Sequence, residues 1–206
     1  MEPFTDALER EGDYELAELD GLDLTGQDAR GARFVECALH RCTLDGVRLG
    51  GARLAETSLV ECRADTLDVT AAEWREVTVT DCRLGAVRAY GGELTRVTIT
   101  GGKIDYLALT DATVRGLRLV DATIEDLDLA GCEVRDLVIE RCRIGRLDVT
   151  RARITSADLR GAELRRVDGL PGLAGATISE VQLLELAPAL AAQLGIVVSG
   201  SVTGRD

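Results

Sequence analysis

Aromatic side chains are scarce in this sequence, making up only 3% of its 206 residues. Folded cores usually draw much of their buried area from phenylalanine, tyrosine and tryptophan, so a core built from this sequence must be aliphatic. No apolar run approaches the length of a transmembrane helix, and the acidic N-terminus lacks the apolar segment of a signal peptide. We therefore expect a cytoplasmic protein that does not contact membranes and whose thiols stay reduced.

Recognisable catalytic motifs are absent as well. The sequence contains no P-loop, no GxSxG and no HExxH motif. Its only histidine is His40, and a lone exposed histidine is far more often a surface residue than a general base. We predict no enzymatic activity, no catalytic residue, no metal site and no cofactor.

What the sequence does contain is a five-residue repeat. Every fifth residue from 19 to 164 is apolar. An α-helix would spread these residues around its whole surface, and a flat strand would turn them alternately to opposite faces. A chain that turns a corner about every five residues instead directs them all to one axis. Four such sides close a coil of twenty residues, and stacked coils share the strand spacing of roughly 4.8 Å.

A second inward position lies two residues before each central one. Only Gln27 and Thr57 are clearly polar there, and between Leu67 and Ala152 large residues alternate with small ones. This position also holds all six cysteines, namely Cys37, Cys42, Cys62, Cys82, Cys132 and Cys142.

The cysteines are best interpreted as small buried hydrophobic residues. The strongest alternative is the stack of Cys42, Cys62 and Cys82 in successive coils, whose spacing of roughly 4.8 Å falls within the Cα range of a disulfide. Their Cβ vectors run parallel instead of converging, however, and tetrahedral zinc also needs convergent ligands.

The repeat resembles the pentapeptide-repeat family, whose loose motif is A(D/N)LXX. The segments DLTGQ, ADLRG and GAELR stand close to that motif, and VTVTD and LVIER are looser versions. The resemblance covers about residues 17 to 167. It implies an all-β solenoid, a right-handed quadrilateral β-helix of pentapeptide repeats, to which this chain adds a short C-terminal α-helical module.

The frame divides the chain into three parts. Residues 1–16 form an acidic N-terminal segment or cap, residues 17–167 form the β-helix, and residues 168–206 form a linker, a helical module and a tail. Their charges differ. The first part carries six acids and one base, the second 26 acids and 22 bases, and the third four acids and one base. The rod is thus nearly balanced, and without a basic groove or aromatic platform we expect no direct nucleic-acid binding.

The C-terminal module shows helix signals. Ser179 and Gln182 resemble a capping box that opens a helix. We expect Pro188 to begin a second short helix, Gly195 to end it, and residues 196–198 to add a short strand.

The leucines of this module leave more apolar surface than a short helical pair can bury on itself. We therefore predict a homodimer through the module; the alternative is that it only plugs the last coil. The residues predicted to form the dimer contact are Leu183, Leu184, Leu186, Leu190 and Leu194.

One side of the predicted rod, centred on residues 19, 39, 59 and so on to 159, is more acidic than the others. Its best row is Glu61, Asp81 and Asp121, one residue per coil with Gly101 as a gap. The full set predicted to bind a partner is Glu61, Asp81, Asp121, Asp20, Glu140 and Asp158.

The family resemblance extends to function. Its gyrase-directed fluoroquinolone-resistance proteins are rods of similar length that end in a helical module pairing two rods. The ending ISEVQLLELAPALAAQLGIVVSGS resembles that module, and the uninterrupted frame resembles the loopless, mycobacterial-type members. The resemblance implies a non-enzymatic protein that binds a type II topoisomerase, DNA gyrase, as an approximate DNA-like rod and modulates or protects it from inhibitors. The alternative is a non-catalytic interaction scaffold for an unrelated protein partner.

Overall fold

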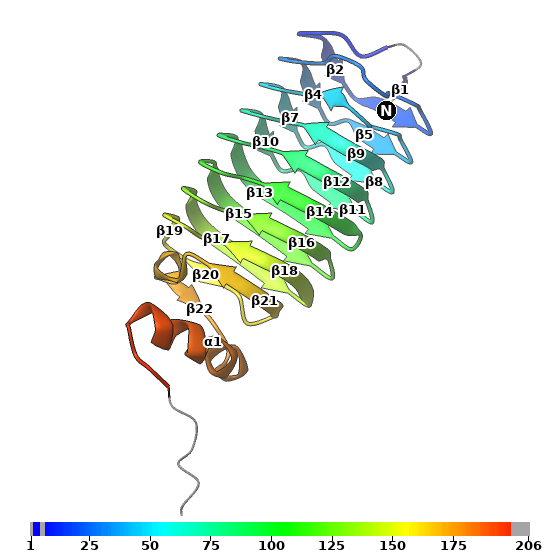
Figure 1. The fold of residues 1–206 in the computed structure, drawn as a ribbon. Helices are drawn as coiled ribbons and strands as arrows, with labels where there is room; N and C mark the ends of the chain where they lie inside the picture. Colours follow the sequence, from blue (N-terminus) through cyan, green and yellow to red (C-terminus); the bar gives the residue numbers. More distant parts are fainter. Residues whose placement is uncertain (1, 5–6, 199–206) are drawn as a thin grey trace, which may run out of the picture.

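The computed structural model describes residues 2–4 and 7–198, and it shows an elongated coil of stacked parallel strands (Figure 1). The coil makes about eight turns. Through most of the coil, paired residues are twenty positions apart, as Thr78 and Thr98 are. The predicted all-β solenoid of pentapeptide repeats is confirmed.

Four sides can be followed along the coil. We number them by the central residues of the first full turn: side 1 by Leu19, side 2 by Leu24, side 3 by Ala29 and side 4 by Phe34. Every twentieth residue after each of these is the centre of the same side in the next coil. The central residues from Leu19 to Leu159 are buried.

The strands of the described residues form two parallel sheets. The 15-stranded sheet, which covers sides 4 and 1, contains β1 (Glu2–Pro3), β2 (Asp13–Glu15), β3 (Ala17–Asp20), β4 (Arg33–Val35), β5 (Ala38–His40), β7 (Arg53–Ala55), β8 (Ser58–Val60), β10 (Glu73–Arg75), β11 (Thr78–Thr80), β13 (Glu93–Thr100), β15 (Thr113–Val120), β17 (Glu133–Glu140), β19 (Arg153–Ile154), β20 (Ala157–Asp158) and β22 (Ala176–Thr177). The seven-stranded sheet, which covers sides 2 and 3, contains β6 (Val47–Arg48), β9 (Arg63–Asp68), β12 (Arg83–Arg88), β14 (Lys103–Ala108), β16 (Thr123–Asp128), β18 (Cys142–Asp148) and β21 (Ala162–Asp168).

Most corners lie two residues after a central residue and have left-handed backbone. The corner residues Arg41, Glu61 and Asp81 have φ of 55°, 53° and 51°. The corner between sides 2 and 3 differs. It is left-handed at Gly26 and Gly46, but from β9 onward each strand runs through it without a left-handed residue. Glycine reaches the left-handed region without the penalty that a Cβ brings, so the early and later coils turn this corner in different ways.

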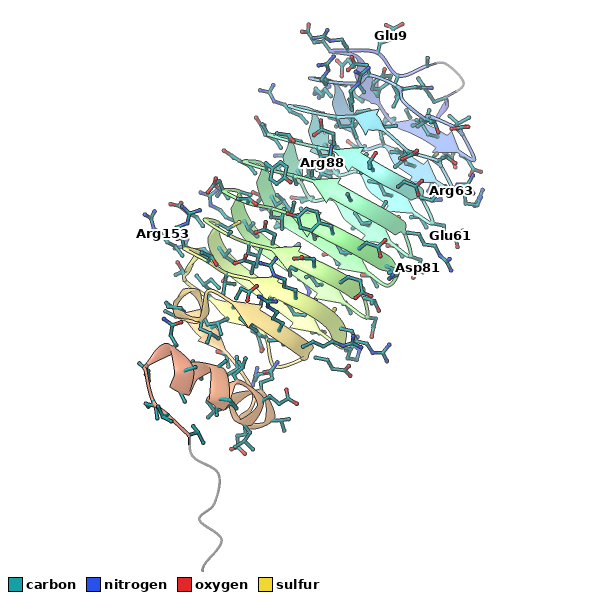
Figure 2. All side chains as sticks on the ribbon, in the orientation of Figure 1. Glu9, Glu61, Arg63, Asp81, Arg88 and Arg153 are labelled. Atoms are coloured by element: carbon teal, nitrogen blue, oxygen red, sulfur yellow. The ribbon has the colours of Figure 1, made fainter. Side chains whose placement is uncertain are left out.

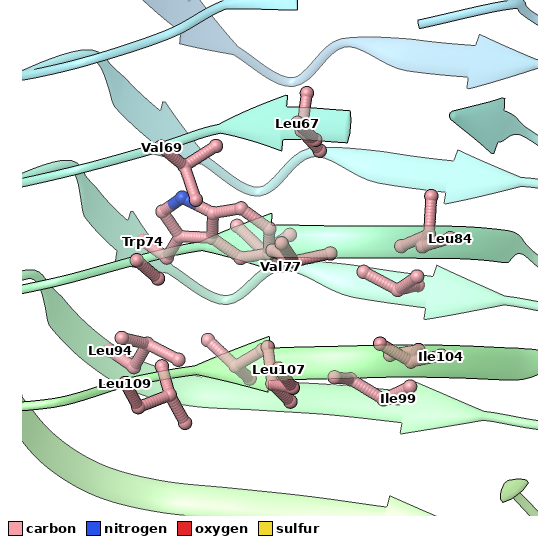
Figure 3. Close-up of a cluster of buried hydrophobic side chains, with 14 of the residues drawn as sticks. Leu67, Val69, Trp74, Val77, Leu84, Leu94, Ile99, Ile104, Leu107 and Leu109 are labelled. Atoms are coloured by element: carbon pink, nitrogen blue, oxygen red, sulfur yellow. The ribbon is translucent and has the colours of Figure 1, made fainter. Parts of the chain in front are cut away.

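The core is filled by aliphatic side chains, with two buried aromatic residues among them, Phe34 in the first full turn and Trp74 further along the coil. Trp74 stacks between Leu54 and Leu94 of the neighbouring coils and is 9% exposed. Its ring lies near Val69 (Figure 3), and both residues line an apolar cavity of about 30 Å³. Because the lining is entirely apolar, a single water there would have no polar partner.

The two polar exceptions at the second inward position both have partners. The side-chain oxygen of Gln27 accepts a hydrogen bond from the Leu8 amide at 2.7 Å. The hydroxyl of Thr57 donates to the carbonyls of Ala55 at 3.0 Å and Phe34 at 3.5 Å. Neither residue therefore interrupts the core.

All six cysteines are buried and free, which confirms their interpretation as core residues. Several thiols donate to two backbone carbonyls; Cys42, for example, lies 3.2 Å from the Leu19 oxygen and 3.4 Å from the His40 oxygen. Burial raises the pKa of the Cys132 thiol to about 12. The Cys132 thiol therefore stays protonated and shielded at neutral pH.

The N-terminal end is closed by aromatic rings. The strands β1 and β2, from the segment predicted as a cap, pair with β3 and β4 and continue the sheet. The rings of Phe4 and Tyr14 meet edge to face with centroids 5.4 Å apart, and Tyr14 stacks on Phe34 at 4.8 Å. Half of the six aromatic residues of the chain thus cover its first coil.

The C-terminal end is closed by a 3₁₀-helix, η1 (Leu170–Leu173), the strand β22, and one helix, α1 (Glu180–Gln193). The capping box of Ser179 and Gln182 is confirmed. The prediction that Pro188 starts a second helix is wrong, because Pro188 lies inside α1. The helix continues past Pro188, because proline removes one amide donor but its fixed φ is compatible with a helix.

The end of α1 agrees in part with prediction. Gly195 has a φ of 71°, and its amide and that of Ile196 donate to the carbonyls of Ala192 and Ala191. These two bonds form a Schellman motif, so Gly195 ends the helix as predicted. The expected strand at 196–198 is wrong, because those residues pair with no other strand. Within the described ranges, no helix is long and apolar enough to cross a membrane.

Candidate protein-interaction surface

The six acidic residues predicted to bind a partner lie on or beside side 1. Asp20, Glu140 and Asp158 stand on its strands, and Glu61, Asp81 and Asp121 stand at its corner with side 2. The structure thus places the set along one edge of the rod, as the five-residue frame requires.

Ion pairing divides these six acids into two groups. Four are neutralised by a neighbouring arginine, in the pairs Asp20–Arg41, Asp121–Arg141, Glu140–Arg118 and Asp158–Arg160. The Arg160 guanidinium lowers the pKa of the Asp158 carboxyl to about 2, and Arg141 likewise lowers the pKa of Asp121. Arginines bonded in this way offset the negative charge of the row for an approaching partner.

Glu61 and Asp81 form the second group. Over residues 2–4 and 7–198, no ion pair involves either carboxylate. Both are exposed, and both project from the same edge of the rod in successive coils (Figure 2). The Asp81 carboxylate occupies the position that a Cβ on Gly101 would take. Because Gly101 has no side chain, the Asp81 side chain can extend over the corner of the next coil.

Between its two corners, side 1 is uncharged over four coils. Its outward-facing positions there hold Ala38, which is only 4% exposed, and His40, Ser58, Val60, Thr78, Thr80, Thr98 and Thr100, and we call this set the uncharged strip. In the same four coils every other side carries arginine and at least one acidic residue. Small and β-branched side chains of this kind give a flat, half-buried sheet surface.

The corner on the other edge of the strip, between sides 4 and 1, is also acidic. Glu36, Glu56 and Glu76 occupy it in three successive coils with φ of 52°, 51° and 56°. Glu76 bonds Arg96, whereas in the described part of the chain Glu36 and Glu56 take part in no ion pair. Sequence reasoning missed these two residues, although a glutamate two positions after centres 34 and 54 was a visible signal.

The side chains of this surface give little support for metal binding or general acid catalysis. Within the described residues, no group of three or more histidine, cysteine, aspartate or glutamate side chains is arranged to hold a metal ion. The resolved aspartate pKa shifts are all downward, so none of those carboxyls is held protonated at neutral pH as a general acid would be.

The second predicted contact lies on α1. Leu186 is 8% exposed and lines a pocket together with Ala162 and Leu164 of the last coil, and Leu190 is half-buried. Leu183, Leu184 and Leu194 remain exposed at 50%, 74% and 76%. The helix therefore directs Leu186 toward the last coil and presents three of the predicted leucines to solvent.

The repeat has a match among known protein families. A family model described as a pentapeptide repeat region matches residues 32–109. The five-residue frame and the parallel coil continue on both sides of that segment. The chain therefore contains a pentapeptide repeat region, and its five-residue repeat extends beyond the matched segment.

The solved structures that match this chain have low sequence identity to it. HetL, a pentapeptide-repeat protein involved in heterocyst differentiation regulation from the cyanobacterium Nostoc sp. strain PCC 7120, is 18% identical, with a TM-score of 0.34, 82% of this chain covered and 90% of that chain. Full-length QnrB1, a plasmid-mediated fluoroquinolone resistance protein, is 15% identical, with a TM-score of 0.27 and coverage of 90% and 100%. A trypsin-treated QnrB1 variant is 16% identical, with a TM-score of 0.29 and coverage of 91% and 100%. No curated protein sequence matches the chain.

Proposed function

We propose that the chain is a non-catalytic rod that binds a protein partner along side 1, and that this partner is a type II topoisomerase, DNA gyrase, whose response to inhibitors it modulates. The observation that carries the proposal is the pair of unpaired carboxylates Glu61 and Asp81 in one corner row. A surface that normally binds DNA phosphates would accept such a row as an approximate substitute. The coil spacing of roughly 4.8 Å limits the match to a few contacts.

A specific observation also favours the second candidate, a scaffold for an unrelated protein. Four of the six acids in the proposed site are bonded to arginines. A strongly anionic, DNA-like row is therefore interrupted after Asp81, and the remaining surface is better suited to mixed polar and apolar contacts of a general protein interface.

A supercoiling assay with purified gyrase separates the two candidates. We expect the wild-type rod to inhibit supercoiling, less strongly as salt rises, because screening acts on exposed charges over about 10 Å. The double variant Glu61→Gln with Asp81→Asn should lose most of this inhibition. The matched control is Asp65→Asn with Glu93→Gln, which removes the same charge from exposed positions on sides 2 and 4 and should inhibit like the wild type. A wild-type rod that leaves activity and drug sensitivity unchanged at tens of micromolar supports the scaffold instead.

We also propose that two rods associate end to end through α1. The exposed Leu183, Leu184 and Leu194 support this contact, and Val181 adds to it at 64% exposed. Exposed apolar patches on a protein surface commonly mark interaction sites. The same contact would present two copies of side 1 to one partner.

A further inference from the structure

The uncharged strip lies between two corner rows that carry exposed carboxylates. Its surface consists of the outward-facing positions of β5, β8, β11 and the second half of β13. One edge carries Glu36 and Glu56, the other Glu61 and Asp81, all exposed. Each edge also holds one arginine that is bonded to an acid, in the pairs Arg96–Glu76 and Arg41–Asp20.

We propose that the uncharged strip and its two edges bind a cationic amphipathic α-helix of a protein partner, lying along the rod axis. The inference deepens the proposed function, because it names the chemistry of the segment that would contact the corner of Glu61 and Asp81. The helix would place a stripe of small uncharged residues on the strip and arginine or lysine residues on both flanks, where they meet the carboxylates of the two edges.

The width and length of the uncharged strip fit a single α-helix. From Glu56 to Glu61 is five residues, so the edges are at most about 17 Å apart, and an α-helix with its side chains is about 10–12 Å wide. The four coils of the strip span about 14 Å along the axis, which corresponds to about ten helical residues at 1.5 Å each. Basic residues three or four positions apart follow the coil spacing closely enough to pair with successive corners.

The backbone excludes a strand as the occupant. The amides of Ser58, Thr78 and Thr98 donate within the ladder to carbonyls of the preceding coil at 2.9–3.0 Å. An added strand binds through free main-chain amides and carbonyls at a sheet edge. Amides that are already paired in the ladder cannot form such hydrogen bonds. The partner must therefore recognise side chains.

Charge excludes two further occupants. Phosphates of a nucleic acid would meet uncompensated carboxylates on both edges of the strip. A second copy of this chain fits no better, because its α1 contains Glu180 and Glu185 and no basic residue, and because two strips face to face would oppose like charges. A basic helix is the complement, and the small area predicts a transient complex.

The test uses the full-length protein and three labelled 18-residue probe peptides in fluorescence anisotropy at low and at physiological salt. The first is an alanine-rich helix with a serine and alanine stripe flanked by arginines. The second has the same composition with the arginines distributed all around the helix, and the third is an unstructured arginine–glycine peptide of equal charge. We expect the first to bind at least tenfold more tightly than the other two.

Two variants locate the binding. Thr78→Tyr with Thr98→Tyr places two bulky rings on the uncharged strip without changing charge, using a residue that suits strands, and should weaken binding of the first peptide at least tenfold. Thr95→Tyr with Thr113→Tyr, the matched change on side 4, should leave it unchanged. Equal binding of all three peptides, or equal binding by both variants, would overturn the proposal. Because gyrase takes no part in this assay, loss of peptide binding and loss of gyrase inhibition can be told apart.

Discussion

At the scale of single residues, the second inward position accepts hydroxyl and thiol groups alongside apolar ones. Thr57 donates to the carbonyls two and 23 positions before it, and Cys42 and Cys62 likewise donate to the carbonyls two and 23 positions before them. Thr57 is therefore no defect in the pattern. The periodicity predicted where these side chains lie, but the bonds depend on carbonyls of the neighbouring coil, whose positions a sequence does not state.

Exchanges at Thr57 test this equivalence. Thr57→Cys should change the free energy of unfolding by less than about 1 kcal/mol, because the thiol reaches the same carbonyls. Thr57→Val keeps the shape but removes the hydroxyl, and should cost about 1 kcal/mol, the net value of a buried hydrogen bond. Urea denaturation measures both. A valine variant as stable as the wild type would show that the hydroxyl contributes nothing.

The candidate site was only partly predictable at this scale. The five-residue frame placed Glu61, Asp81 and Asp121 in one row correctly. It did not reveal that Asp121 bonds Arg141 in the next coil while Asp81 faces Gly101, because the frame does not specify which outward side chains meet across a coil boundary. Solvated pairs of this kind are individually weak, so they affect binding more than folding.

At the scale of elements, Gln182 connects the helix to the rod. Its amide nitrogen donates to the carbonyls of Leu159 and Ala162, both at 2.7 Å, and its oxygen accepts from the Ser179 amide. The side chain is only 4% exposed. One residue therefore caps α1 and also satisfies two carbonyls at the open end of the sheet. The capping box predicted the first role from sequence, whereas the second requires the position of the last coil.

Gln182→Glu tests the second role. A carboxylate cannot donate to the two carbonyls, and we expect a loss of about 2–4 kcal/mol at pH 7.5 from the unsatisfied buried groups. Burial beside carbonyl oxygens should raise the pKa of the new glutamate above its unfolded value of about 4.3. The penalty should therefore shrink as the pH falls through the raised pKa, since the protonated acid donates again.

Thermal melts of the Gln182→Glu variant at several pH values measure this dependence. The control is Gln193→Glu, the same substitution at an exposed position of α1, which should leave the melting temperature nearly unchanged at each pH. Equal melting temperatures for the two variants would argue that Gln182 does not secure the helix to the rod.

At the scale of the whole molecule, the repeat predicted the architecture because each central residue has only one way to reach a shared axis. The ends were less predictable, since a terminal coil lacks the neighbour that specifies its geometry. The aromatic cap of Phe4, Tyr14 and Phe34 and the single helix through Pro188 are both end features. They are also where this rod differs most from a uniform stack of coils.

The assembly of two such rods is the last expectation at this scale. About eight coils give a rod of roughly 35–40 Å at the strand spacing, and a two-fold junction at α1 would about double it. Leu184→Glu should place a charge inside that junction and convert the dimer into a monomer of 22.0 kDa, measured by multi-angle light scattering at micromolar concentration. Leu16→Glu, an exposed leucine near the opposite end, is the control and should leave the dimer intact. Deleting the module is a poorer test, because it would also uncover the carbonyls that Gln182 satisfies. A wild-type protein that is already monomeric under these conditions would contradict the junction and leave α1 as a cap alone.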